Sequence, residues 1–124
     1  MHLTAQRVQV AATASQVPLV LGGDCTVGIG TVAGMLAAAS GRIGLIHSDL
    51  NTPRCVPDGA LDWMGMVHLL DAPDALPELR QSGSRTPLLA PEQVVVFGHS
   101  HAHDTPGSGR LTPAAACAPC RSRR

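Results

Sequence analysis

The feature that most constrains the fold is the stretch from residue 20 to residue 53, which has the pattern strand, helix, strand. A short apolar segment ends in Gly22-Gly23-Asp24, a mostly apolar segment of helical length follows, and a second apolar segment runs into polar residues 47–53. Two strands joined by a crossover helix run parallel, and open parallel sheets gather ligand-binding residues where their strands end. The sequence therefore predicts an α/β unit whose chemistry lies at the carboxyl ends of two strands.

Apolar spacing and boundary residues predict the other elements. Helical periodicity, with Thr26 as a candidate N-cap, predicts three helices, and short apolar runs predict three buried strands. In chain order we expect a helix at 3–15, a strand at 19–21, a helix at 26–39, a strand at 42–46, a helix at 61–70 and a strand at 92–97. The proline-rich residues 71–92 are expected to form an irregular connection. The expected class is α/β, as part of a three-layer α/β/α arrangement with a parallel sheet.

Composition divides the chain near Gly98. The residues after it are rich in Gly, Pro, Ala, Ser, His and Arg and contain almost no branched apolar residues. Such a segment cannot bury enough apolar surface to offset the entropy lost on ordering. We therefore expect one α/β domain over residues 1–98 and a disordered or frameshifted tail over residues 99–124.

Charge and aromatic content exclude several classes of partner. The formal net charge is zero and the pI is about 7.0, so neither nucleic acid nor an anionic membrane surface is an expected partner. Trp63 and Phe97 are the only aromatic residues, which leaves no platform for stacking bases. No apolar run approaches the roughly 18 residues of a spanning helix, and the first residues do not resemble a signal peptide. We expect a cytoplasmic protein with reduced cysteines.

Two motifs carry a resemblance to a known family. Gly22-Gly23-Asp24-Cys25, followed after a helix by His47-Ser48-Asp49-Leu50-Asn51-Thr52-Pro53, resembles the two N-terminal signatures of the arginase/agmatinase/formiminoglutamase family of manganese ureohydrolases. The resemblance covers roughly residues 15–98 and implies half of an arginase-like fold, since a whole ureohydrolase is more than twice this length. It further implies hydrolysis of a guanidino-type C–N bond in a small guanidino or formimino substrate.

The metal ligands that the resemblance implies are only partly present. Cys25 stands where the family has a His, and His47 and Asp49 match the last two members of an Asp-x-His-x-Asp strand end, whose first Asp falls at Leu45. No distal Asp-x-Asp pair occurs in the chain. The expected metal residues are therefore Cys25, His47 and Asp49, and Asn51 is the expected substrate-binding residue. Because two neighbouring metal ions need several anionic ligands, we expect this chain alone to be inactive.

The residual ligands change the expected metal. The family cofactor is Mn²⁺, which favours carboxylate, water and imidazole, whereas a thiolate favours softer ions, so Zn²⁺ is the expected alternative at a single site. Two interpretations stay open. Either the chain is a ureohydrolase-family hydrolase whose remaining parts are encoded elsewhere or lost through a sequence error, or it is a non-catalytic remnant that binds one metal ion or a partner. The uncovered apolar surface of a half sheet also predicts self-association.

Three other features have ordinary explanations beside functional ones. His99, His101 and His103 could chelate Zn²⁺ or Ni²⁺, but the simpler explanation is a polar tail with adventitious metal affinity. Cys25 could instead be a small residue that packs at a strand-to-helix turn. His68 has apolar neighbours along the third expected helix, so we expect an ordinary, partly buried histidine there.

Overall fold

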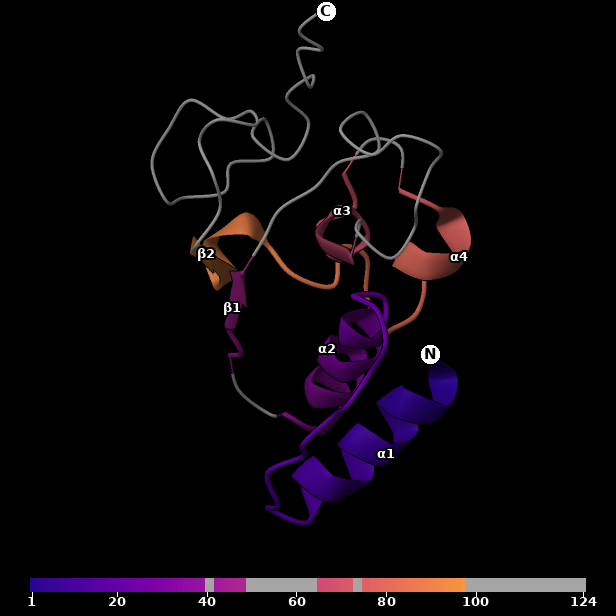
Figure 1. The fold of residues 1–124 in the computed structure, drawn as a ribbon, viewed down its shortest axis with the longest axis vertical. Helices are drawn as coiled ribbons and strands as arrows, with labels where there is room; N and C mark the ends of the chain where they lie inside the picture. The colour runs from indigo at the N-terminus through magenta and orange to yellow at the C-terminus, as the bar shows by residue number, and fades with distance from the viewer. Residues whose placement is uncertain (40–41, 49–64, 73–74, 98–124) are drawn as a thin grey trace, which may run out of the picture.

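The computed structural model describes residues 1–39, 42–48, 65–72 and 75–97. In chain order these residues form α1 (His2–Thr13), α2 (Val27–Ala38), β1 (Leu45–Ser48), α3 (Gly65–Leu69), α4 (Pro77–Arg80), the 3₁₀ turn η3 (Pro91–Gln93) and β2 (Val94–Phe97). Figure 1 shows α2 between α1 on one side and the two strands on the other. No helix in these ranges is long and apolar enough to cross a membrane.

The two strands form a parallel sheet with a single register. Leu45 pairs with Val94, Ile46 with Val95, His47 with Val96, and Ser48 with Phe97. Parallel pairing and flanking helices confirm the predicted α/β class. The prediction that the strand at 92–97 is buried was wrong for one face, because Val95 is 54% exposed while Val94 and Val96 are buried. Successive side chains of a strand point to opposite faces, and the helices cover only one of them here.

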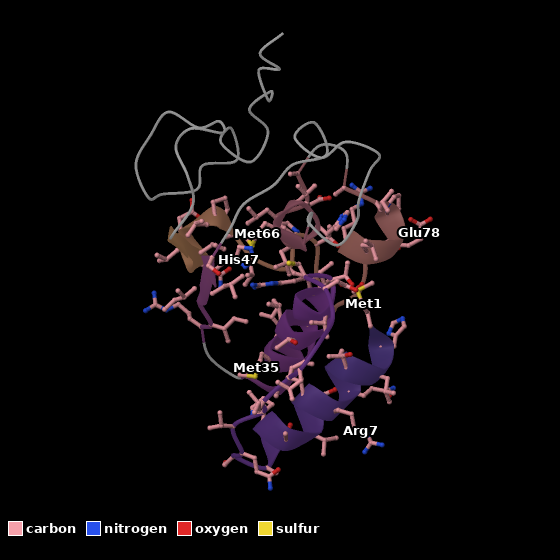
Figure 2. The ribbon with its side chains drawn as sticks, viewed as in Figure 1. Met1, Arg7, Met35, His47, Met66 and Glu78 are labelled. Atoms are coloured by element: carbon pink, nitrogen blue, oxygen red, sulfur yellow. The ribbon has the colours of Figure 1, made fainter. Side chains whose placement is uncertain are left out.

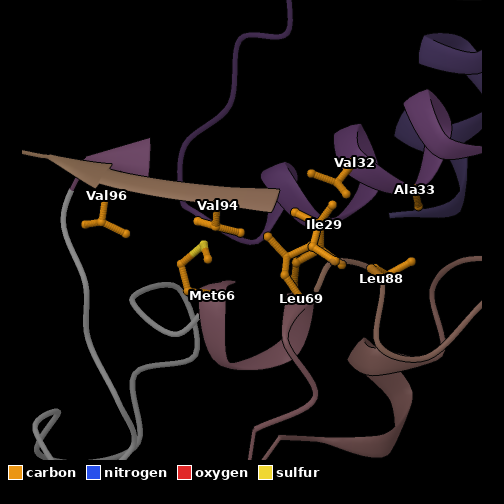
Figure 3. Packing of buried hydrophobic residues seen from close by; sticks show 9 residues of the cluster. Ile29, Val32, Ala33, Met66, Leu69, Leu88, Val94 and Val96 are labelled. Carbon is orange, nitrogen blue, oxygen red and sulfur yellow. The ribbon is translucent and has the colours of Figure 1, made fainter. Parts of the chain in front are cut away.

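The core lies between that covered face and the helices. Figure 3 shows Met66 of α3 reaching Val94 of β2, with Ile29 of α2 and Leu69 of α3 packed beside them. The buried cluster comprises Ile29, Val32, Ala33, Met66, Leu69, Leu88, Leu89, Val94 and Val96. Its members come from α2, α3, β2 and the segment that precedes β2, so the core joins residues that are far apart in the sequence.

Both long helices were predicted with nearly the observed bounds. Because α2 is mostly apolar, it must be covered on most sides, and α1 covers the side that faces away from the strands (Figure 1). The two helices approach closely at Gly30 and Gly34, since a Cβ on Gly30 would lie 2.9 Å from the carbonyl oxygen of Met1 and a Cβ on Gly34 would lie 2.8 Å from Cβ of Val8. Val8 is accordingly buried in the contact.

Two sequence-based assignments were wrong because they depend on contacts between distant residues. Residues 19–21 are not in a strand, and Leu19 and Leu21 are 86% and 87% exposed. An extended segment becomes a strand only when it pairs with a neighbour, and within the described residues β1 pairs with β2. The strand expected at 42–46 begins later, at Leu45, because the side-chain amide of Gln93 donates to the carbonyl of Ile43 at 2.8 Å in place of a backbone ladder.

The connection at 71–92 is also more regular than expected. Its prolines begin helical turns as well as interrupt structure: Pro77 is the first residue of α4 and Pro91 the first of η3. Proline suits the first helical position because its missing N–H would have no partner there and its φ is already helical. The expected helix at 61–70 is observed as α3, with residues 61–64 outside the described ranges.

Candidate metal centre

The turn before α2 is held by Asp24. Oδ1 of Asp24 accepts a hydrogen bond from the backbone N–H of Thr26 at 2.7 Å and a second one from the Thr26 hydroxyl. Thr26 occupies the N-cap position, as predicted, but its side chain makes no capping bond to α2. Its hydroxyl donates backward to Asp24. Asp24 therefore organises the turn in which Cys25 lies.

The same contacts set the charge state of Asp24. The hydrogen bond from the Thr26 side chain, followed by that from the Thr26 backbone, lowers the pKa of Asp24 below its usual 3.8. Both bonds favour the ionised carboxylate. One oxygen of this carboxylate is already engaged by the turn, so Asp24 acts within the loop as an orienting group for its neighbours. Sequence reasoning missed this role, although an Asp two residues before a Thr at a helix start is a known turn signature.

Cys25 lies at the start of α2 with its side chain exposed. Its carbonyl accepts a hydrogen bond from the N–H of Gly28 at 3.1 Å, which fixes the backbone at this point. Gly65, the first residue of α3, packs directly on it: a Cβ there would lie 3.1 Å from the Cys25 carbonyl oxygen and 3.7 Å from Cys25 Cβ. The absence of a side chain at Gly65 lets α3 approach Cys25. No local pattern in the sequence could have revealed this contact.

His47 lies inside β1, opposite Val96. It is partly buried, whereas its neighbours Ile46 and Ser48 are exposed, so its side chain lies on the sheet face that packs on the helices. Figure 2 shows His47 on the side of β1 where Met66 of α3 lies. The sequence placed His47 just beyond a strand that ended at Ile46. The strand instead continues through Ser48.

Only part of the predicted ligand set lies in the described residues. Cys25 and His47 are described, whereas Asp49 and Asn51 lie outside the described residues, so their roles stay predictions. In the described ranges no three His, Cys, Asp or Glu side chains gather in a group that could hold a metal ion. Of the predicted ligands, the described ones are the thiol of Cys25 and the imidazole of His47. An imidazole suits both manganese and zinc, whereas a thiolate favours ions softer than Mn²⁺.

Comparison with known proteins relates this chain to arginases. The model of the arginase family matches residues 1–105. The arginase of Bacillus caldovelox is 40% identical over 85 residues, covering 65% of this chain and 27% of the relative. The arginase of Bacillus subtilis strain 168 is 36% identical over 99 residues, covering 76% of this chain and 32% of the relative.

The solved structures agree with the sequence matches. A crystal structure of Bacillus subtilis arginase superposes with a TM-score of 0.66 at 31% identity, covering 77% of this chain and 33% of that chain. The native structure of Bacillus caldovelox arginase gives a TM-score of 0.65 at 33% identity, covering 77% of this chain and 32% of that chain. The arginase-like fold that the sequence predicted is confirmed. The chain spans about a third of the length of the relatives that it matches.

Proposed function

The chain belongs to the arginase family, and from that premise we propose that it binds a single metal ion and does not by itself hydrolyse a guanidino substrate. The proposed ligands are Cys25, His47 and Asp49, with Asn51 as the residue nearest a substrate. One thiolate, one imidazole and one carboxylate suit tetrahedral Zn²⁺ better than Mn²⁺. The two-metal hydrolysis that the family resemblance implies needs more carboxylates than these residues provide.

The placement of Cys25 and His47 carries this proposal. Cys25 is exposed at the start of α2 and is held there by the Asp24 turn and by α3. His47 follows Ile46 on β1, the strand that comes next in the chain after α2. No strand precedes α2 in the described residues, so the expectation that the two side chains approach each other rests on the family resemblance of the two motifs and on their order along the chain. Asp49, which follows Ser48 in the sequence, would add the third ligand.

The inactivity is tested by assaying the purified chain. Urea or ammonia release should stay at the level of a heat-treated sample with arginine, agmatine, guanidinobutyrate or formiminoglutamate and with Mn²⁺ present. The thiolate ligand is tested separately with Co²⁺ as a probe for zinc, because Co²⁺ bound to a thiolate gives a charge-transfer absorption band. Cys55, Cys117 and Cys120 are first replaced by serine, since any of these thiolates could give the same band. The band should appear in that chain and vanish when Cys25→Ser is added. Substrate turnover would overturn the proposed inactivity, and a band that survives the substitution would overturn Cys25 as a ligand.

A second candidate function is a hydrolase whose site is completed by another polypeptide. One observation favours it: Ile46 and Val95 are 74% and 54% exposed on the outer face of the sheet, and Leu19 and Leu21 are exposed on the segment before α2. Side chains of this kind are normally covered in a stable domain. The nucleotide sequence downstream, translated in all frames, would then contain a Ser-x-Asp-x-Asp-x-x-Asp-Pro segment, and its absence would remove this candidate. A guanidino or formimino substrate and a cytoplasmic location stay predictions.

A further inference from the structure

His68 is the one polar side chain buried in the core of the described residues. It is 0% exposed, and all five residues of α3 are buried with it. The sequence predicted a partly buried histidine, and the difference arises because α3 is covered by α2, by α4 and by the segment at Leu88 and Leu89. A side chain at such a position must satisfy its polar atoms within the protein.

The imidazole makes one hydrogen bond and leaves one nitrogen without a partner. Its Nδ1 accepts from the backbone N–H of Leu76 at 3.2 Å, and Leu76 is the N-cap residue of α4. A nitrogen that accepts carries no proton, so the neutral ring holds its proton on Nε2. Nε2 is buried and has no hydrogen-bond partner within the described part of the chain. His68 therefore ties the start of α4 to α3 only in its neutral form.

The charged groups around His68 offer an imidazolium little compensation. Helix α2 and strand β2 carry no titratable side chain, and β1 carries only His47. On α4, Arg80 pairs with Asp71 at 2.8 Å, and Glu78 is exposed. Asp62 and Asp74 lie outside the described residues. His68 lies in the last turn of α3, where a helix dipole favours a cation, but the ring is buried among apolar side chains.

We propose that His68 is an acid-sensitive latch between α3 and α4. A proton that arrives at Nδ1 removes the acceptor for the Leu76 N–H and places a charge among the apolar side chains of the core. Both effects release the start of α4 from α3. The latch lies outside the metal-binding residues, so it does not depend on the proposed function.

The direction of the pH dependence follows from burial. Burial lowers the pKa of His68 below its usual 6.5, because the charged ring is poorly solvated in the core. The unfolded chain then takes up a proton at a higher pH than the folded chain. The stability contributed by the neutral ring is complete above about pH 6.5 and is lost as the pH falls below it. One such group changes the ratio of folded to unfolded chain by at most about tenfold per pH unit.

The test compares unfolding of the full chain between about pH 8 and about pH 5, a range that brackets the ordinary histidine pKa. The wild-type ratio of folded to unfolded chain should fall by up to about tenfold per pH unit below pH 6.5. In His68→Asn, the side-chain oxygen can accept from Leu76 without titrating, so this fall should be lost. His2→Asn, which removes an exposed histidine of α1, should leave the fall unchanged. An unaltered fall in His68→Asn overturns the proposal.

A second measurement does not require a variant to fold. The titration of the His68 ring, followed by NMR in the wild-type chain, should lie below the usual histidine pKa of 6.5. The Leu76 amide should also exchange with solvent faster, relative to other protected amides, as His68 takes up its proton. A His68 titration at or above that usual pKa, or an unaltered relative exchange of Leu76, would contradict the latch.

Discussion

Replacement of Gly34 by alanine tests a close contact between two helices, the approach of α1 to α2. A Cβ at Gly34 would lie 2.8 Å from Cβ and 3.0 Å from Cγ1 of Val8, and it would also press on the carbonyl oxygen of Ala5. That oxygen belongs to the backbone of α1, so the helix must move as a unit. At Gly28, on the same helix, a Cβ would meet no atom of the described residues within 4 Å, apart from its chain neighbours and the backbone of its own helix. Gly28→Ala is therefore the matched control.

The two substitutions should have opposite signs. Alanine in place of glycine favours a helix by about 1 kcal/mol, and by less in the first turn, where Gly28 lies. At Gly34 this gain is opposed by overpacking, which costs about 1 to 3 kcal/mol, and by partial exposure of Val8, whose full burial is worth about 1.5 to 3 kcal/mol. We expect Gly34→Ala to destabilise the chain by about 1 to 2 kcal/mol, as the difference of these terms. Gly28→Ala should be neutral or stabilising.

Urea unfolding followed by circular dichroism measures both changes on the same scale. The Gly34→Ala midpoint should fall below that of the wild type while the Gly28→Ala midpoint should not. If Gly34→Ala were as stable as Gly28→Ala, then α1 would not pack on α2 as closely as the structure has it. Removal of the Val8 contact by Val8→Ala should also make a later Gly34→Ala less costly, because the two changes share one contact.

Two further predictions concern surfaces near the proposed site. Gly65→Val should lower the zinc affinity about tenfold, as the loss of a supporting contact typically does, because its side chain would displace Cys25. Gly28→Ala should leave the zinc affinity unchanged. Equal zinc affinities for the two variants would contradict the packing of α3 on Cys25. The double substitution Leu19→Ser and Leu21→Ser should reduce self-association and binding of an apolar dye with little loss of stability, since both side chains are largely exposed. Sedimentation of the wild type and the double variant at several concentrations would show equal self-association if this segment were not part of the associating surface.

The elements predicted correctly are those whose signal is local. α1 and α2 were found within two residues of their expected bounds because helical spacing and boundary residues lie within each segment. The strand at Val94–Phe97 was likewise marked by four consecutive strand-forming residues. Residues 19–21 have the same apolar character, yet they form no strand. Pairing decides that outcome, and pairing depends on residues that are distant in the sequence.

The candidate site, like the fold, has some features that local sequence predicts and others that depend on packing. The motifs identified Cys25 and His47 by residue type and order, and their role as metal ligands stays a prediction. Neither the Gly65 contact on Cys25 nor the burial of His68 could be predicted, since both arise from the way α3 packs. The sequence placed the end of the strand at Ile46, two residues early, because the pairing of His47 with Val96 and of Ser48 with Phe97 depends on residues distant in the sequence.

The most direct test of the central claim is a calorimetric titration of the full chain with Zn²⁺ and with Mn²⁺. His99, His101, His103, Cys117 and Cys120 are first replaced by alanine, so that these tail ligands contribute no affinity of their own. We expect one zinc ion to bind more tightly than manganese, and Cys25→Ser and His47→Ala each to weaken zinc binding by about tenfold or more, as the loss of an entire ligand requires. Tighter manganese than zinc binding, or zinc binding unchanged by both substitutions, would contradict the proposed site.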